Sequence, residues 1–249
     1  MVGGAPAASR GAPVRGAAAV EVLEAVEPPR IGEGMQMKLS QSDLQKIEEA
    51  VQRVERTTRG EIVPVLLSQS ASYSDAGHLL ALDGAIAAGV SSYCMHEVLG
   101  PGWTLSTAEF ALEIAAGWGI GMALSFIPAV RRMYLGRRRL AETVQERAFA
   151  AFTRNGLMNT TDRCGVLLLV SLFERRAVLL GDRGIHAVVG DDYWKEELGR
   201  ITDGIHGQNI ATALLEGVTR IGALMADKFP PDGTPRDELS NRLKTDLHR

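Results

Sequence analysis

The sequence predicts an α/β domain with a small sheet of three or four strands, flanked by helices and interrupted by a hydrophobic helical hairpin. Three observations carry this prediction. Mostly apolar runs at residues 61–67, 165–171 and 177–181 have the length and the branched side chains of buried strands. Segments with apolar residues at helical spacing lie before and after these runs. Residues 76–131 contain two long apolar stretches joined by a turn-rich linker.

The first part of the domain, residues 38–75, is expected to contain one helix followed by one strand. The helix begins after Ser40, because Ser40 and Asp43 have the spacing of a capping box and apolar residues follow at helical intervals. The strand covers residues 61–67. Pro64 within this strand lacks a backbone N–H donor, which indicates an edge strand or a bulge.

The second part of the domain, residues 132–231, is expected to contain a helix, two strands and two further helices. The apolar runs 165–171 and 177–181 are separated by a short turn, which predicts a β-hairpin in the centre of the sheet. The helices that follow end before the prolines at positions 230 and 231. Residues 232–249 are interpreted as a polar C-terminal tail.

Residues 1–37 precede the domain and are rich in Gly, Ala and Pro, without a periodic apolar face. This composition predicts a disordered segment. A start of translation at Met35 or Met37 fits equally well, because the first predicted helix begins directly after these residues. The segment also lacks the continuous apolar core of a secretory signal, so we expect no cleavable export signal.

The composition excludes several classes of protein. A length of 249 residues with 45% hydrophobic residues is sufficient for one core with additional chain. The net charge of -3 provides no general attraction for nucleic acid, so we expect no nucleic-acid partner. Cys94 and Cys164 are too few for a disulfide framework, and a reducing compartment is the simpler interpretation.

The two apolar stretches within residues 76–131 are candidates for membrane spans. The second is uncharged from residue 114 to 130 and approaches the roughly 20 residues that a bilayer core requires. The first contains Asp83, whose charge would cost about 2.5–3.5 kcal/mol near the centre of a membrane. Small residues one helical turn apart favour close pairing of the two helices in lipid. These are Ala85 with Gly89 and Gly117 with Gly121.

The charges around the stretches predict an orientation. Five arginines lie within residues 131–139, whereas the linker at 96–103 contains neither Lys nor Arg. By the positive-inside rule, both ends of the hairpin then lie in the cytoplasm. We therefore predict a two-span protein of the bacterial inner membrane, with N- and C-termini cytoplasmic and the lipid bilayer as a partner.

Two alternatives to membrane insertion fit the same apolar stretches. In the first, the helices form a soluble subdomain whose Gly and Ala faces pack against protein. In the second, the domain is wholly soluble and the insert is an interface between copies of the chain. The basic run at residues 131–139 also has two further readings, a solvated start of a helix or a contact with anionic lipid.

Two segments resemble the TPM domain family. The first, residues 161–171 with the sequence TDRCGVLLLVS, is followed by two arginines, a strand and the sequence GDRGI at 181–185. The second is a helix that leads through TRGE at 58–61 into a strand. The resemblance covers residues 38–245 and implies the small α/β sheet described above.

A bacterial subgroup of this family is also similar to the chain. The similarity lies in GIHA at 184–187, in Trp194, and in the closing sequence FPP at 229–231. Members of this subgroup are described as membrane proteins, with two transmembrane helices inserted between the first strand and the next helix. The family implies no single reaction, because its members are linked to photosystem II repair, receptor modulation, divalent-metal binding and phosphatase activity.

Asp162 and Asp182 are the candidate metal ligands. Both lie in loops next to predicted strands, where ligands often bind in α/β sheets. Carboxylates suit a hard cation such as Ca²⁺ or Mg²⁺. The alternative is that Asp162 lies in a turn, that Asp182 opens a second turn, and that Asp191 or Asp192 caps a helix.

The sequence contains no motif that pairs a catalytic nucleophile with a general base. His186 has no second histidine at ligand spacing, Cys164 reads as a small buried residue, and Ser171 lacks the nucleophile-elbow motif. We therefore expect a non-catalytic, membrane-anchored module that binds a protein partner or a metal ion. The alternative is a metal-dependent phosphatase or related hydrolase that uses Asp162 and Asp182.

Overall fold

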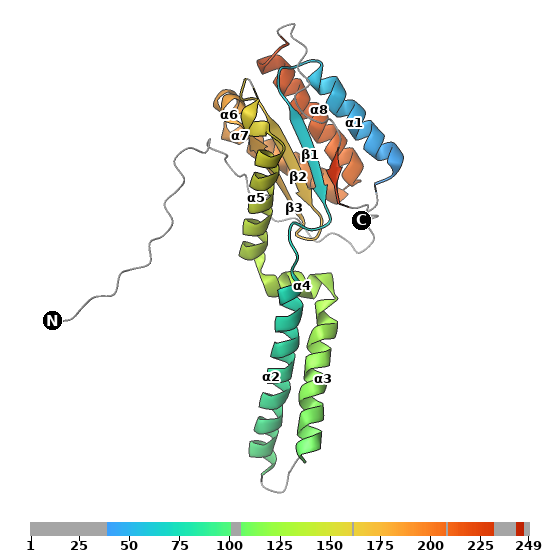
Figure 1. Ribbon diagram of the computed structural model, residues 1–249, viewed down its shortest axis with the longest axis vertical. Helices are drawn as coiled ribbons and strands as arrows, with labels where there is room; N and C mark the ends of the chain where they lie inside the picture. Colours follow the sequence, from blue (N-terminus) through green and yellow to red (C-terminus); the bar gives the residue numbers. More distant parts are fainter. Residues whose placement is uncertain (1–38, 101–105, 161, 208, 232–242, 247–249) are drawn as a thin grey trace, which may run out of the picture.

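A computed structural model describes residues 39–100, 106–160, 162–207, 209–231 and 243–246 (Figure 1). The predicted disordered segment 1–37 lies outside the described residues. In chain order the elements are α1 (Gln41–Glu55), β1 (Ile62–Leu67), α2 (Ser74–Leu99), α3 (Thr107–Ser125), α4 (Pro128–Leu135), α5 (Arg137–Arg154), the 3-10 helix η1 (Leu157–Asn159), β2 (Val166–Ser171), β3 (Arg176–Gly181), α6 (Arg183–Val189), α7 (Asp191–Gly207), α8 (Ile210–Lys228) and β4 (Lys244–Thr245).

The four strands form one mixed sheet in the order β3-β2-β1-β4. β1 pairs with β2 in parallel, although α2 to α5 lie between them in the sequence, and β2 pairs with β3 in antiparallel. β4 adds a short parallel pairing to the other side of β1, at Val65 and Leu66. The predicted α/β fold with a three- or four-stranded sheet is therefore confirmed.

Helices cover both faces of the sheet, which explains why its strands are continuous apolar runs. Successive side chains of a strand point to opposite faces. In β2, Leu168 and Val170 pack in the core formed with α1, α7 and α8, whereas Leu167 and Leu169 pack in the core formed with α5. All six residues of β2 are buried.

The helices of the domain begin at the capping residues that local chemistry favours. The predicted capping box of α1 is present, because the Asp43 N–H donates to Ser40 Oγ at 3.1 Å and the Ser40 N–H donates to the Asp43 carboxylate at 3.2 Å. Asn209 caps α8 by accepting a bond from the Ala211 N–H at 2.9 Å. Helix α8 buries one face along its whole length and packs beside α1 (Figure 1).

Several details of the sheet differ from the expectation. The β2–β3 hairpin is not central, because β3 is an edge strand. β1 is not an edge strand, because β4 pairs with it at Val65 and Leu66. Pro64 pairs with Leu168 of β2 and lies just outside the stretch that pairs with β4. Strand β4 lies within the segment interpreted as a polar tail. Its position is stabilised by the Ser68 N–H and Oγ, which donate to the Asp246 carboxylate at 2.6 and 2.9 Å.

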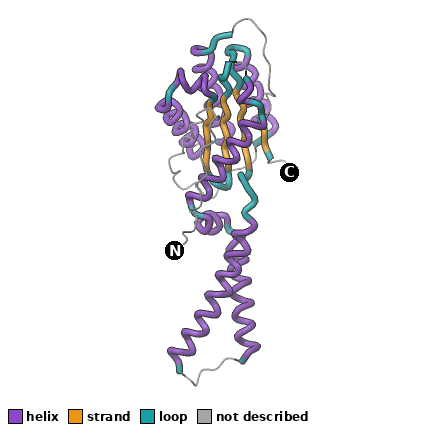
Figure 2. The backbone as a smooth tube through the Cα atoms, turned by 60° about the vertical axis from the view of Figure 1, so that its left-hand side comes forward, coloured by secondary structure: helices purple, strands orange, loops and turns teal. Residues whose placement is uncertain are grey.

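Two antiparallel helices extend from the end of β1 away from the sheet. α2 and α3 run side by side, and α4 lies across their base, between them and the sheet (Figures 1 and 2). The axes of α3 and α4 are bent by 98° relative to each other. Helix α4 crosses the boundary expected at residue 131, because Pro128 occupies its first turn and Gly136 ends it.

Candidate functional site

The predicted carboxylates lie at the edge of the sheet that is farther from α2 and α3. The Asp182 N–H donates to the Gly165 carbonyl at 2.9 Å, which places Asp182 where β2 begins and β3 ends. A Cβ atom on Gly184 would lie 2.7 Å from the Asp162 carbonyl oxygen, so the two loops are in contact. This is the amino edge of the parallel strands. Ligands in α/β sheets more often bind at the carboxyl edge.

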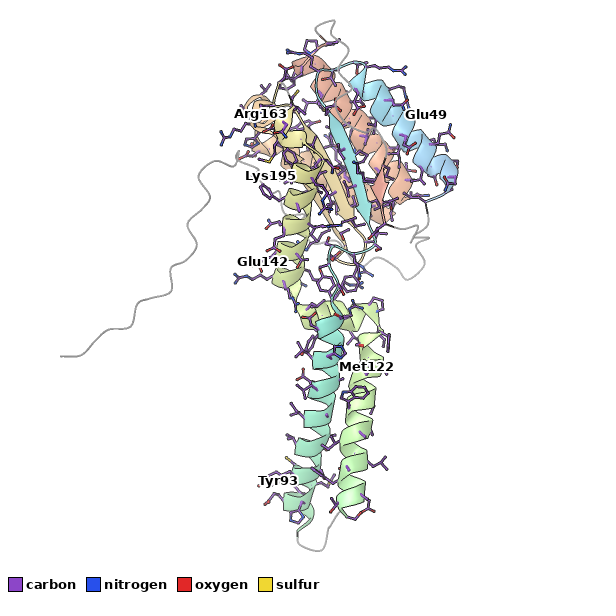
Figure 3. The ribbon with its side chains drawn as sticks, viewed as in Figure 1. Glu49, Tyr93, Met122, Glu142, Arg163 and Lys195 are labelled. Atoms are coloured by element: carbon purple, nitrogen blue, oxygen red, sulfur yellow. The ribbon has the colours of Figure 1, made fainter. Side chains whose placement is uncertain are left out.

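Each of the two carboxylates has an arginine beside it. Asp162 Oδ1 lies 3.5 Å from Arg59 Nη1. Asp182 is fully buried and caps α6 through its Oδ1, which accepts a bond from the Arg183 N–H at 2.7 Å. Its Oδ2 has no hydrogen-bond partner and lies 4.0 Å from Arg163 Nη1. Figure 3 labels Arg163 at this end of the domain.

The side chains at this edge of the sheet do not by themselves provide a full set of ligands for a cation. Ca²⁺ takes six to eight oxygen ligands. Among the residues that the structure describes, no three His, Cys, Asp or Glu side chains are grouped to hold a metal ion. The metal site at Asp162 and Asp182 therefore stays a prediction.

The other polar residues considered from the sequence have structural contacts. His186 Nε2 lies 3.2 Å from Asp191 Oδ1, which connects α6 to the first turn of α7. Cys164 is buried, and burial raises the pKa of its thiol to about 11, so the thiol is protonated at neutral pH. Ser171 is buried and donates to Glu174.

The carboxyl edge of β1 and β2 contains a buried polar cluster that the sequence did not indicate. The Glu174 carboxylate accepts hydrogen bonds from the Ser70 N–H at 2.8 Å, from the Tyr73 hydroxyl at 2.7 Å and from Ser171. Burial, and then the bond to Glu174, raises the pKa of Tyr73. Because Tyr73 is the N-cap residue of α2, this cluster joins the sheet to the extending helices.

Phe173, in the turn between β2 and β3, forms the second half of this joint. Its ring lies 5.3 Å from the ring of Tyr73. The guanidinium carbons of Arg131 and Arg132, both from α4, lie 5.1 and 5.8 Å from its centroid. Arg132 Nη1 also donates to the Phe173 carbonyl at 3.4 Å. The turn is therefore in contact with both α2 and α4.

Glycines allow α2 and α3 to approach closely. A Cβ atom on Gly117 would lie 2.4 Å from the Gly84 carbonyl oxygen, and one on Gly121 would lie 2.1 Å from the Leu80 carbonyl oxygen. The contact uses Gly117 and Gly121, as expected. On α2, the backbone contacts lie at Leu80 and Gly84, and Gly84 is adjacent to the expected Ala85. The expected Gly89 also faces α3, because a Cβ atom there would lie 3.0 Å from Ile114 Cδ1.

The outward faces of both helices expose large apolar side chains. On α2 these include Leu82, Ile86 and Val90, and on α3 they include Leu112, Trp118 and Ile120, with exposed fractions from 49 to 71%. Exposed apolar side chains also lie toward both ends of the hairpin, at Leu79 near its base and at Tyr93 near the far end, where Figure 3 labels Tyr93. The hairpin therefore buries its small residues and exposes its large apolar ones.

The length and composition of the helices bear on whether they can cross a membrane. No single helix in the described part of the chain is both long and apolar enough to cross a membrane. Helices α3 and α4 meet the requirement only together, as a pair bent by 98°. The expectation of two single spans is not supported by this comparison.

Comparisons with known proteins agree with the sequence resemblance. Residues 134–224, from the end of α4 into α8, match the family model of the TPM domain. The fold is similar to the NMR structure of the BA42 protein from the psychrophilic bacterium Bizionia argentinensis, with a TM-score of 0.51 and 19% identity over 85% of this chain and 98% of that chain. No curated protein matches the chain. The matched segment contains β2 and β3, so residues 134–224 are similar to a TPM domain, and the similarity in fold agrees with this match.

Proposed function

We propose that the α2–α3 hairpin anchors the TPM domain to a membrane, where the domain acts as a non-catalytic module that binds a protein partner. The observation that carries this proposal is the exposure of large apolar side chains on the outward faces of both helices. A helix that is apolar all round is ordinarily buried in protein or in lipid. Exposed apolar patches of this kind mark contact with a membrane or a partner.

The dimensions and the packing of the hairpin support lipid as its environment. At 1.5 Å per residue, α2 is about 39 Å long and α3 about 28 Å, compared with about 30 Å for the hydrocarbon core of a bilayer. Helices in lipid associate through small residues that let their backbones approach. Gly84, Gly117 and Gly121 have this role here.

Most charged groups of the hairpin lie near its ends or have partners. Asp75 pairs with Arg139 at 2.6 Å, and Asp83 accepts a bond from the Tyr134 hydroxyl at 2.8 Å, both at the end near α4. At the far end, Glu109 belongs to the capping box of α3. Glu113 lies within the first two turns of α3. This distribution lowers the cost of placing the middle of the hairpin in lipid.

The arginines indicate the orientation of the proposed anchor. Arg131, Arg132 and the arginines that begin α5 all lie at the end of the hairpin next to the TPM domain. The positive-inside rule therefore favours a cytoplasmic TPM domain and a hairpin that enters the inner membrane from that side.

Extraction of membranes that contain the full chain tests the anchor. We expect the protein to stay with the membrane after treatment with sodium carbonate. Ile86→Lys, which introduces a charge midway along α2, should shift protein to the soluble fraction, because a lysine near the centre of a span costs about 2.5–3.5 kcal/mol. Val188→Lys is the matched control, because Val188 is a similarly exposed apolar residue on α6. Wild-type protein released by carbonate would reject the anchor.

Cysteine labelling tests the orientation separately. In a Cys94→Ser background, Thr107→Cys places a thiol at the far end of the hairpin and Glu49→Cys places one on α1 (Figure 3 labels Glu49). An impermeant maleimide added outside the inner membrane should label Cys only in the Thr107→Cys variant. Labelling confined to the Glu49→Cys variant would reverse the proposed orientation.

A divalent cation at Asp162 and Asp182 is a second proposal, with a metal-dependent hydrolase as its catalytic form. The buried Asp182 Oδ2, which lacks a hydrogen-bond partner, is the observation that favours a cation there. Calorimetry with Ca²⁺ and Mg²⁺ tests binding, and phosphomonoester hydrolysis tests the reaction. Asp182→Asn keeps the helix cap and should abolish both; equal heats and rates in the variant and the wild type would reject this proposal.

A further inference from the structure

We propose that the base of the hairpin binds the headgroup of an anionic phospholipid, with Arg131 and Arg132 contacting its phosphate. This inference rests on the proposed membrane anchor and names the lipid that the anchor would recognise. It depends on three observations at the same place in the fold: positive charge without a paired carboxylate, an adjacent cavity, and exposed apolar side chains at the cavity and next to it.

The positive charge around Phe173 has no acidic partner in the described part of the chain. Arg131 and Arg132 lie over the Phe173 ring, and neither forms an ion pair with a described carboxylate. The Arg131 Nε is buried without a hydrogen-bond partner. The pKa of Arg132 is lowered, first by burial and then by the charge of neighbouring Arg175. An anion would relieve this repulsion and complete the hydrogen bonds of the guanidinium groups.

The nearby carboxylates already have hydrogen-bond or ion-pair partners. Glu174 accepts its bonds from the Ser70 N–H, the Tyr73 hydroxyl and Ser171. The later arginines of the basic run differ from Arg131 and Arg132 in this respect, because Arg138 pairs with Glu142 and Arg139 pairs with Asp75. The charge available for an anion is therefore concentrated at α4 and at the β2–β3 turn.

A cavity of about 210 Å³ lies beside Arg131, between α2 and the end of α3. Its surface is mostly apolar, with Met122 and Phe126 in the wall, and polar groups such as those of Ser74 and His78 contribute only a small part. An inorganic anion would use only the polar part of this cavity. An amphiphile uses both, with its glycerol and first methylene groups against Met122 and Phe126.

Exposed apolar side chains lie at the cavity and next to it along the chain, where they would contact acyl chains. Phe126 and Met133 are 78% and 80% exposed, and Ile127 is also exposed. Phe126 and Ile127 precede α4 and Met133 lies within it. Helix α4 crosses the base of the hairpin between the sheet and the two long helices (Figure 2). In the proposed anchor this level coincides with the headgroups, and basic pockets between membrane helices on the cytoplasmic side bind such groups.

Thermal unfolding of the detergent-solubilised full chain tests the site. We expect short-chain phosphatidylglycerol to raise the unfolding temperature, because a ligand that binds only the folded state stabilises it. Short-chain phosphatidylcholine and inorganic phosphate should have little effect. The double variant Arg131→Gln with Arg132→Gln should weaken the apparent affinity for phosphatidylglycerol by about tenfold or more. The loss of one hydrogen bond to a charged group is enough to lower an affinity by about tenfold.

Two control variants distinguish recognition of the lipid by Arg131 and Arg132 from effects on folding and from a general effect of positive charge. The double variant Arg138→Gln with Arg139→Gln removes an equal charge from two paired arginines and should leave the response to lipid unchanged. Arg131→Lys retains a cation over the ring and should retain part of the response. Equal stabilisation by the two lipids, or an unchanged response in the double variant, would overturn the lipid site.

Vesicle flotation distinguishes failure of the site from failure of the anchor. Full-length protein that floats equally with phosphatidylcholine vesicles and with vesicles containing phosphatidylglycerol overturns lipid recognition and leaves the anchor in place. Protein that stays in the aqueous fraction with both kinds of vesicle overturns the anchor, and the lipid site with it. Preferential flotation with the anionic vesicles, lost in the double variant, supports both.

Discussion

The hydroxyl of Tyr73 donates a hydrogen bond to the carboxylate of Glu174 at 2.7 Å, although the two residues are 101 positions apart in the sequence. Tyr73 precedes the first turn of α2, and Glu174 lies in the turn between β2 and β3. This bond joins the α/β domain to the hairpin that interrupts it. The position of the hairpin is therefore linked to the edge of the sheet by a buried polar contact.

Tyr73→Phe tests how strongly this contact stabilises the joint. The ring and its packing on Phe173 are retained, but the buried Glu174 loses one of its donors. We expect the free energy of unfolding to fall by about 1–3 kcal/mol, the usual cost of an unsatisfied buried polar group. Chemical denaturation measures this change. Thr57→Val, which removes a local hydrogen bond at the end of α1, is a control expected to have a smaller effect.

The glycine contacts between α2 and α3 give a second prediction with a matched control. Gly117→Ala places a Cβ atom 2.4 Å from the Gly84 carbonyl oxygen, so the helices must separate or shift. We expect destabilisation of about 1–3 kcal/mol, as for overpacked interiors. Gly119→Ala, two residues away in the same helix, meets no atom within 4 Å and should be neutral or stabilising. Equal unfolding temperatures for the two variants would contradict the close approach.

Local signals account for the parts of the fold that the sequence predicted. The capping box at Ser40 and Asp43 involves residues three positions apart, and the apolar runs of β1 and β2 reflect cover on both faces of the sheet. Helix α4 also had local signals, Pro128 at its start and Gly136 at its end. The apolar composition continues across residues 126–130, so the start of α4 is not separated from the preceding apolar stretch by any change in composition.

Long-range contacts account for what the sequence did not predict. Strand β4 has two residues and no periodic pattern, and the bonds that hold it link Ser68 to Asp246, 178 positions away. The joint at Phe173 likewise brings together the β2–β3 turn and an arginine 41 positions earlier. Neither pairing leaves a pattern within one segment, so only the folded arrangement reveals it.

The thiol of Cys164 provides a prediction about reactivity. Burial raises its pKa to about 11, so at pH 8 about one molecule in a thousand carries the reactive thiolate. In a Cys94→Ser variant, alkylation by iodoacetamide at pH 8 should therefore be slow in the folded protein and fast in urea. The raised pKa also means that folding stability declines as the pH rises from about 9 toward 11, where the unfolded chain ionises first. Rapid alkylation of the folded variant would show that the thiol is accessible.

The buried ion pair between α7 and α8 gives the prediction with the largest expected effect. Glu197 is fully buried, and Arg220 Nε lies 2.8 and 3.1 Å from its two carboxylate oxygens. Arg220→Gln leaves this carboxylate with Arg200 at 3.7 Å as its remaining cation. We expect the free energy of unfolding at pH 7 to fall by about 3–5 kcal/mol, because removal of one partner leaves a buried charge poorly compensated.

The pH dependence of the same variant distinguishes charge from packing. Burial raises the pKa of Glu197, and Arg220 partly opposes that shift, so the variant should raise the pKa further. A raised carboxyl pKa stabilises the folded protein at low pH, and this stabilisation is lost as the pH rises through the folded-state pKa. The loss in Arg220→Gln should therefore be smaller near pH 5 than at pH 7. The double variant Glu197→Gln with Arg220→Gln removes the buried carboxylate charge and should recover much of the free energy of unfolding lost at pH 7. Glu216→Gln alters only the exposed partner of Arg220 and should change the free energy of unfolding little. A loss in Arg220→Gln that is equal at both pH values would indicate that Arg220 acts through packing alone.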